Sequence, residues 1–131
     1  MKTLTIKEPY ATLIKEGIKE YEFRTWKTKY RGPILIHAGK SKDKKEIERR
    51  RDLNLKCSSG EIIAKVDLTD CIEVTDEFRE ELKQIDAVTY KHIIEDKSWK
   101  GYAFKLENVT KVNPIKINGR LSFWEYDYKS W

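Results

Sequence analysis

The stretch Glu61-Ile-Ile-Ala-Lys-Val-Asp-Leu-Thr-Asp-Cys-Ile-Glu-Val74 decides the fold class of this 131-residue chain. Most of its apolar residues stand at even positions and alternate with mostly polar neighbours: Ile62, Ala64, Val66, Leu68, Ile72 and Val74. Because alternate side chains of a strand point to opposite faces, the pattern predicts one long, half-buried antiparallel strand. Asp70 interrupts the apolar face, which indicates a β-bulge at that point.

Shorter strands are predicted around this one, over residues 4–6, 20–26, 34–38 and 102–106. Residues 34–38 are apolar on both faces, which is typical of a buried central strand. The dipeptide Asn118-Gly119 lies between the apolar pairs Ile115/Ile117 and Leu121/Phe123, which predicts a tight two-residue hairpin. Strands joined by such turns favour a mostly antiparallel sheet, curled toward a β-barrel that would leave no exposed edge.

Two to four helices are expected at the periphery of this sheet, which makes the fold class α+β. Pro9 suits the first position of a helix that ends before Gly17. A surface helix is predicted from Ser41 to Leu53, and another segment over residues 87–95. Thr75 is a suitable cap for the helix between them, on which Phe78, Leu82 and Ile85 share one face.

Length and composition favour one domain, spanning residues 1–131, with a real hydrophobic core. Apolar residues make up 39% of the chain, and the 4 Trp, 7 Tyr and 4 Phe argue against disorder. No apolar run approaches the roughly 20 residues of a membrane span, and no signal peptide opens the sequence, so we expect a cytoplasmic protein without a membrane partner. Cys57 and Cys71 lack neighbours at ligand spacing, which predicts no metal, cofactor or disulfide framework.

The charge is unevenly distributed along the chain. Residues 1–65 carry 17 Lys and Arg against 9 Asp and Glu, a balance of +8, whereas residues 66–131 carry 10 against 13, a balance of −3. A domain polarised in this way is expected to have one positive face, which would suit an anionic partner such as nucleic acid. An unused, solvated basic face would have the same composition.

The pattern Gly17-x-Lys19-x-x-Glu22-x-Arg24 carries the most chemical information. On a strand, Glu22 and Arg24 share one face, and Lys19 is close enough in sequence to join them. Tyr21 and Phe23 on the opposite face suit the core, so the charged face is expected to line a cleft, where its charges need partners. The alternative is an edge strand with these charges in solvent.

Cations alternate with aromatic residues in Arg24-Thr-Trp-Lys-Thr-Lys-Tyr-Arg31. Nucleic-acid binders need cations that neutralise phosphates and flat rings on which bases stack. This indicates a nucleic-acid surface formed by Lys27, Lys29, Tyr30, Arg31 and Lys40. On pattern alone, Trp26 as a core ring with solubilising lysines around it explains the segment equally well.

Histidines and nucleophiles offer little else. His37 lies on the buried strand, either as a satisfied core residue or as a ligand contact at the cleft edge, and His92 is expected to be structural. The chain has no Gly-rich phosphate loop, Ser-His-Asp order or pair of carboxylates in a convincing cleft, so no residue is assigned a catalytic role.

Several stretches together resemble the ASCH family, named for homology to activating signal cointegrator. They are Leu4-Thr-Ile-Lys-Glu-Pro-Tyr-Ala11, the pattern from Gly17 to Trp26, Tyr30-Arg-Gly-Pro-Ile-Leu-Ile-His-Ala38, Gly101-Tyr-Ala-Phe-Lys-Leu-Glu107, Gly119 and Phe123-Trp-Glu125. The resemblance implies a PUA-like β-barrel with a cleft between the first helix and the barrel. It also implies that the cleft binds RNA, single-stranded nucleic acid or a nucleotide-like ligand. The expected ligand-binding residues are Tyr10, Lys19, Glu22, Arg24, Trp26 and His37.

Three positions depart from the family pattern. Glu8 and Tyr10 stand where relatives often have Gln and Trp, and Glu8 is expected to add a negative charge beside the cleft. Some small relatives hydrolyse acetylated cytidine with a Lys and a Thr, but Glu22 occupies the Thr position here, and a carboxylate does not replace a hydroxyl nucleophile. A nucleic-acid-binding module is therefore favoured over a hydrolase or nuclease, and over a module that binds ligand or protein without nucleic acid.

Overall fold

The computed structural model describes residues 1–129. Six strands form one sheet in the order β2-β5-β4-β3-β1-β6. The strands are β1 (Lys2–Glu8), β2 (Tyr21–Arg24), β3 (Gly32–Lys42), β4 (Glu61–Glu73), β5 (Tyr102–Lys116) and β6 (Phe123–Glu125). The helices are α1 (Tyr10–Lys15), α2 (Lys44–Arg49), α3 (Asp76–Asp86) and α4 (Lys91–Glu95), with a 3₁₀ turn at Arg51–Leu53.

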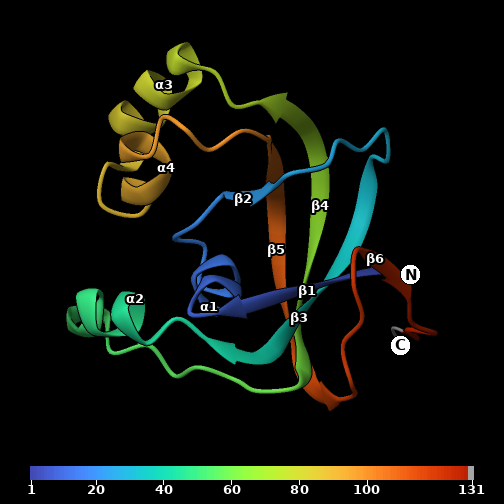
Figure 1. Cartoon of the computed structure of the whole chain (residues 1–131). Coiled ribbons are helices and arrows are strands. Elements are labelled where there is room, and N and C mark those ends of the chain that lie inside the picture. The colour runs from blue at the N-terminus through green and yellow to red at the C-terminus, as the bar shows by residue number, and fades with distance from the viewer. Residues whose placement is uncertain (130–131) are drawn as a thin grey trace.

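The sheet is mixed, because β1 and β3 run parallel while every other neighbouring pair is antiparallel. The predicted α+β class is therefore confirmed. The predicted closed barrel is not: β2 and β6 are the two ends of the sheet, and within residues 1–129 no strand pairing joins them. The sheet curves without closing (Figure 1).

The long strand predicted from the alternating residues is β4, which pairs with β3 on one side and with β5 on the other. The expected bulge is confirmed, since the register with β5 shifts between Leu68 and Asp70. A second shift between Ile62 and Ala64 explains why Ile63, an odd-numbered residue, is also buried. Residues 34–38 are fully buried between β1 and β4, as expected of a central strand.

The predicted hairpin at Asn118-Gly119 is wrong. β5 ends at Lys116 and pairs with β4 and β2, whereas β6 pairs with β1 at the far end of the sheet. Gly119 serves a close crossing instead: a Cβ there would lie 2.6 Å from Thr5 Oγ1 and 2.9 Å from His37 Cε1. Only glycine lets the chain pass this near to β1 and β3.

Helix α1 lies against the curved sheet and contacts β1, β3, β4 and β5 (Figure 1). Gly17 ends it with a left-handed φ of +75°, as the sequence predicts. The helix predicted over 41–53 is shorter, because β3 continues to Lys42 and Asp43 then caps α2 by accepting a hydrogen bond from the Glu46 N–H. Residues 43–49 thus project away from the sheet as a short arm.

Helices α3 and α4 form a second arm on the same side of the sheet (Figure 1). Thr75 caps α3 as expected, and Phe78 and Leu82 are buried, but Ile85 is 50% exposed. The prediction that Ile85 shares the buried face is wrong because the core cluster that holds α3 is completed by Tyr90, Ile93 and the end of β2. The cleft described next lies between α4 of this arm and α1.

Candidate ligand-binding cleft

A buried ion-pair group formed by Lys19, Glu22 and Arg24 lies at the floor of the cleft. Lys19 Nζ donates a hydrogen bond to Glu22 Oε1 at 2.8 Å and another to the Tyr21 carbonyl oxygen. Arg24 Nη2 donates to Glu22 Oε2 and to the Thr5 carbonyl oxygen, both at 2.9 Å. Glu22 and Arg24 therefore share one face of β2, as predicted, and Tyr21 is buried against α3 and α4, but Phe23 is only half-buried and also lines the cleft.

The three charges keep the floor ionised despite its burial. Burial alone would raise the pKa of Glu22, but Lys19 and Arg24 outweigh it and hold this pKa below its ordinary value. Burial lowers the pKa of the Lys19 ammonium, and the Glu22 carboxylate opposes that shift. Glu22 is thus a carboxylate whose two oxygens already accept hydrogen bonds.

Aromatic rings form the walls above this floor. Lys19 Nζ lies 5.1 Å from the ring centroid of Phe23 and 5.7 Å from that of Tyr10, which are cation–π distances. Tyr90 and Trp99 line the same space, together with His92 and Ile93 of α4. The compartment measures about 240 Å³ and is bounded by α1 on one side and α4 on the other.

Tyr10 connects the two arms at the mouth of this compartment. Its hydroxyl donates to Asp43 Oδ2 at 2.9 Å and lies 3.0 Å from His92 Nε2. Burial and the bond to Asp43 raise the pKa of Tyr10, so the phenol stays protonated. A hydroxyl has one proton, and Tyr10 donates it in the hydrogen bond to Asp43. The hydroxyl oxygen therefore accepts the other bond, in which His92 Nε2 must be the donor.

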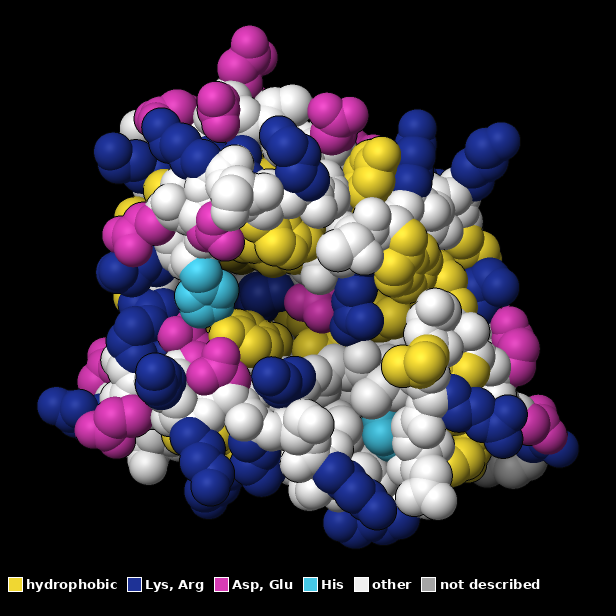
Figure 2. All heavy atoms as spheres, viewed as in Figure 1, with side chains coloured by type: hydrophobic (Ala, Val, Ile, Leu, Met, Phe, Trp, Pro, Cys, Tyr) yellow, Lys and Arg dark blue, Asp and Glu magenta, His cyan; other side chains and the backbone are white. Residues whose placement is uncertain are grey.

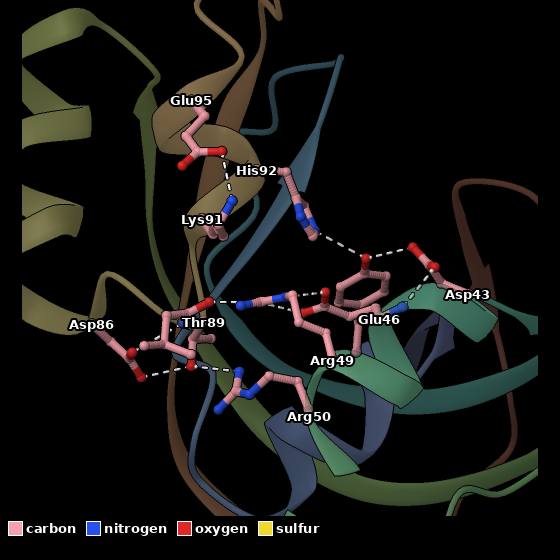
Figure 3. Close-up of polar contacts among 11 residues, drawn as sticks. Asp43, Glu46, Arg49, Arg50, Asp86, Thr89, Lys91, His92 and Glu95 are labelled. Atoms are coloured by element: carbon pink, nitrogen blue, oxygen red, sulfur yellow. Dashed lines mark hydrogen bonds and ion pairs between the residues drawn. The ribbon is translucent and has the colours of Figure 1, made fainter. Parts of the chain in front are cut away.

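A second set of polar contacts joins the two arms (Figure 3). Arg49 pairs with both oxygens of Glu46, at 2.7 and 2.8 Å, and donates to the Val88 carbonyl oxygen at 2.6 Å. Arg50 donates to Thr89 Oγ1 at 3.0 Å, and Thr89 in turn donates to Asp86 at 2.6 Å. These contacts tie α2 and the residue after it to the segment that leads into α4.

The cleft opens into a wider trough of about 580 Å³ beside Arg24. Trp26 and Lys40 line this trough, again with Tyr10, Glu22 and Trp99. Figure 2 looks into this cleft, where cationic and acidic side chains are visible at the floor, hydrophobic side chains border it above and below, and a His side chain lies at its edge. Trp26 also packs on Phe104 and Phe123, so it is both a core ring and part of the lining.

The expected ligand-binding residues gather around this space with one exception. Tyr10, Lys19, Glu22, Arg24 and Trp26 all line it. His37 instead lies in a neighbouring hollow of about 370 Å³, 1% exposed, with its Nε2 at 2.7 Å from the Ile117 carbonyl oxygen.

The expected nucleic-acid surface is only partly brought to the cleft. Lys40 lines the trough, while Lys27 and Lys29 are exposed outside it. Tyr30 donates to the Pro33 carbonyl oxygen beneath the Lys2 ammonium, and Arg31 pairs with Asp70 at 3.7 Å. Tyr30 and Arg31 are therefore held by the protein itself.

Glu8 does not add a charge to the cleft, contrary to the expectation. It is fully buried, accepts hydrogen bonds from the Thr12 N–H, the Thr12 hydroxyl and the Ser58 N–H, and lines none of these cavities. Its role is to hold the loop before β4 against α1.

The sequence reasoning missed the wall that α4 supplies. The cleft is also lined by five residues that lie more than 60 positions from Lys19 along the chain: Thr89, Tyr90, His92, Ile93 and Trp99. The aromatic and apolar residues over 90–99 were a usable signal of a packed segment. The sequence does not say which surface of the protein this segment covers.

No helix within residues 1–129 is long and apolar enough to cross a membrane. Within the same residues, no three His, Cys, Asp or Glu side chains are grouped so that they could hold a metal ion.

Comparison with known proteins gives a consistent result. The model of the ASCH domain matches residues 4–118. The crystal structure of ASCH from Zymomonas mobilis is similar at a TM-score of 0.58 and 17% identity, over 88% of this chain and 72% of that one. Two point mutants of the same Zymomonas mobilis protein match at TM-scores of 0.54 and 0.55 and 18% identity, over 88% of this chain and 74% and 73% of theirs. A search of curated proteins finds no match.

Proposed function

This chain belongs to the ASCH domain family, and on that premise we propose that its cleft binds single-stranded RNA or a nucleotide-like ligand. The observation that carries the proposal is an aromatic-walled compartment that opens directly onto the Arg24 guanidinium. An unpaired base has a flat face for the rings and polar edges for the charged floor.

The rings supply an affinity that does not depend on base identity. Stacking of one base on an aromatic side chain contributes about 1–3 kcal/mol, and Phe23 and Trp99 already form an edge-to-face pair at 6.2 Å beside the ion-pair group. The compartment that α1 and α4 bound on two sides suits a flat ligand.

Arg24 supplies the donors. Its Nη2 is used by Glu22 and Thr5, whereas its Nε and Nη1 donate to no residue among 1–129. The side chain is 23% exposed, so these N–H groups are available to a phosphate oxygen or a base edge.

The test is a titration of fluorescein-labelled single-stranded RNA of mixed sequence, followed by fluorescence anisotropy over a series of salt concentrations. The affinity should fall by about 0.7 log units per log unit of salt for each phosphate contacted. Arg24→Gln should weaken binding about tenfold or more, because a charge-assisted hydrogen bond contributes about 1.5–3 kcal/mol.

Lys83→Gln is the matched control, because Lys83 is exposed on α3 and lines none of the cavities described above. Circular dichroism of both variants checks that they are folded. The triple variant Lys27→Gln, Lys29→Gln, Arg31→Gln should weaken binding to all sequences alike but less than Arg24→Gln, because these cations lie outside the cleft and act on the strand at a distance. Absence of binding to the wild-type protein even at low salt contradicts the proposal.

A further inference from the structure

The cleft does not end at Arg24, since three cavities follow one another along this face. The aromatic compartment shares Tyr10, Glu22, Phe23 and Trp99 with the trough. The trough in turn shares Thr5, Gly39 and Lys40 with the hollow at His37. We call this continuous surface the groove, and Figure 2 shows the face on which it lies.

The three compartments differ in size and lining. The aromatic compartment, at about 240 Å³, is smaller than the roughly 300–1,000 Å³ of cavities that bury a drug-sized molecule. It suits one base rather than a whole nucleotide. The trough and the hollow add about 580 and 370 Å³, so most of the space lies beyond the aromatic part, and the trough has the most polar lining of the three.

Cations follow the groove away from the aromatic compartment. Lys7, Arg24 and Lys40 line the trough, and Lys40 and Arg120 line the hollow. Within residues 1–129, none of the ion pairs includes Lys7, Lys40 or Arg120. Lys7 interacts at longer range with Asp43, whereas Lys40 and Arg120 present their positive charge to the groove.

The carboxylates near the trough are already engaged. Glu22 accepts from Lys19 and Arg24, and Asp43 accepts from Tyr10 and from the Glu46 N–H. The pKa of Asp43 lies below its ordinary value, because these hydrogen bonds and nearby Lys7 outweigh its burial. The trough thus keeps a net attraction for anions.

The hollow ends on an apolar side chain. Leu121 lies beside Arg120 and is 93% exposed, the most exposed large hydrophobic residue of the described chain. A cation next to an exposed apolar side chain suits a phosphate followed by the face of a base.

We infer that the groove binds a phosphodiester-linked strand of at least two nucleotides, rather than a free nucleoside. The first base occupies the aromatic compartment, its phosphate lies among Lys7, Arg24 and Lys40, and the next nucleotide lies beside Arg120 and Leu121. The inference rests on the proposed function, because it assigns positions within the same binding surface.

Isothermal titration calorimetry at low salt tests it with ligands of increasing length. For each of the four bases in turn, the probes are the nucleoside, its 5′-monophosphate and its 5′-phosphorylated dinucleotide. We expect affinity to increase about tenfold or more from the nucleoside to the monophosphate, and to increase again with the dinucleotide.

Variants assign each increase to its compartment. Lys40→Gln should reduce the affinity of the monophosphate and of the dinucleotide, whereas Arg120→Gln should remove only the dinucleotide increment. Lys83→Gln, on a different surface, should change neither.

Two results would overturn the inference while leaving the proposed function standing. One is binding of all three ligands with equal affinity, and the other is a dinucleotide increment that Arg120→Gln leaves intact. Absence of binding by every probe and by the labelled RNA would instead overturn the proposed function and this inference together.

Discussion

Lys19 and Glu22 form an ion pair of 2.8 Å in which the two side chains are only 4% and 10% exposed. The pair stands at the junction of α1 and β2, since Gly17 ends the helix and the Lys19 N–H still bonds to the Leu13 carbonyl oxygen. A charged pair so buried is costly to form, and it repays that cost only when its hydrogen bonds are complete. Its position at the floor of the groove links the stability of the fold to the proposed binding.

Breaking this pair should destabilise the protein strongly. Glu22→Met should lower the free energy of unfolding by about 3–5 kcal/mol, because it leaves the Lys19 ammonium buried without its partner. The double variant Lys19→Met, Glu22→Met should be more stable than Glu22→Met alone, since the uncompensated charge is gone. Urea unfolding followed by circular dichroism measures the free energy of unfolding of the wild type, of Glu22→Met and of the double variant.

The exposed pair Lys91–Glu95 is the control for these variants of the buried pair. Its nitrogen–oxygen distance is also 2.8 Å, but its side chains are 50% and 63% exposed. Glu95→Met should cost less than about 1 kcal/mol, because solvent screens such pairs. Equal losses at Glu22 and Glu95 would show that burial of the Lys19–Glu22 pair has no energetic consequence.

The lowered pKa of Glu22 predicts an acid-dependent part of the stability. Between this lowered value and the ordinary 4.5, the unfolded chain binds more protons than the folded one, so the free energy of unfolding rises with pH there. The stabilisation is complete above the ordinary value and is lost as the pH falls through the folded value. Glu22→Gln lacks this contribution.

Urea unfolding of wild type and Glu22→Gln over a pH series measures this pH-dependent contribution of Glu22 to stability. The difference in stability between the two should be constant near neutral pH and should shrink in acid. Other carboxyl groups contribute equally to both proteins and cancel in the difference. A difference that persists unchanged in strong acid would contradict the lowered pKa.

Tyr10 should determine the tautomer of His92. Because the Tyr10 hydroxyl donates its hydrogen bond to Asp43, neutral His92 must carry its proton on Nε2 in order to donate to Tyr10. Long-range ¹H–¹⁵N NMR detects the position of this proton directly. Tyr10→Phe should lose that preference and about 1–2 kcal/mol of stability, since two hydrogen bonds disappear. Tyr30→Phe is the control, because the Tyr30 hydroxyl makes one bond, to Pro33, at an exposed position. A His92 proton found on Nδ1 would refute the arrangement.

Local patterns in the sequence were sufficient for the floor of the site and for the central strands. Alternation alone places Glu22 and Arg24 on one face, and the position of Gly17 brings Lys19 to them. The path after β5 was not predictable in this way. Asn118-Gly119 satisfies the rules of a tight turn, yet β6 pairs with β1, more than 110 residues earlier. The wall from α4 depends on similar long-range packing, through Tyr90 against Tyr21 and Phe23.

We expect no appreciable hydrolysis of acetylated cytidine. Both oxygens of Glu22 already accept hydrogen bonds, and general-base catalysis by one carboxylate would contribute only about 10²–10⁴-fold. The one Thr hydroxyl that lines the aromatic compartment, that of Thr89, is held between Arg50 and Asp86. Incubation with the acetylated nucleoside and chromatography for free cytidine measures turnover. Release that disappears in both Lys19→Ala and Glu22→Ala would make the hydrolase the primary function.

The most direct measurement of the central claim is NMR titration of the ¹⁵N-labelled protein with a short single-stranded RNA. We predict that the Arg24 side-chain Nε–H, the indole N–H groups of Trp26 and Trp99, and the backbone amides of Lys19 and Glu22 shift with a common saturation curve. Amides on the outer face of α3, such as those of Glu80 and Lys83, should stay unmoved. Saturable binding that moves α3 and leaves all the groove signals in place would contradict the account.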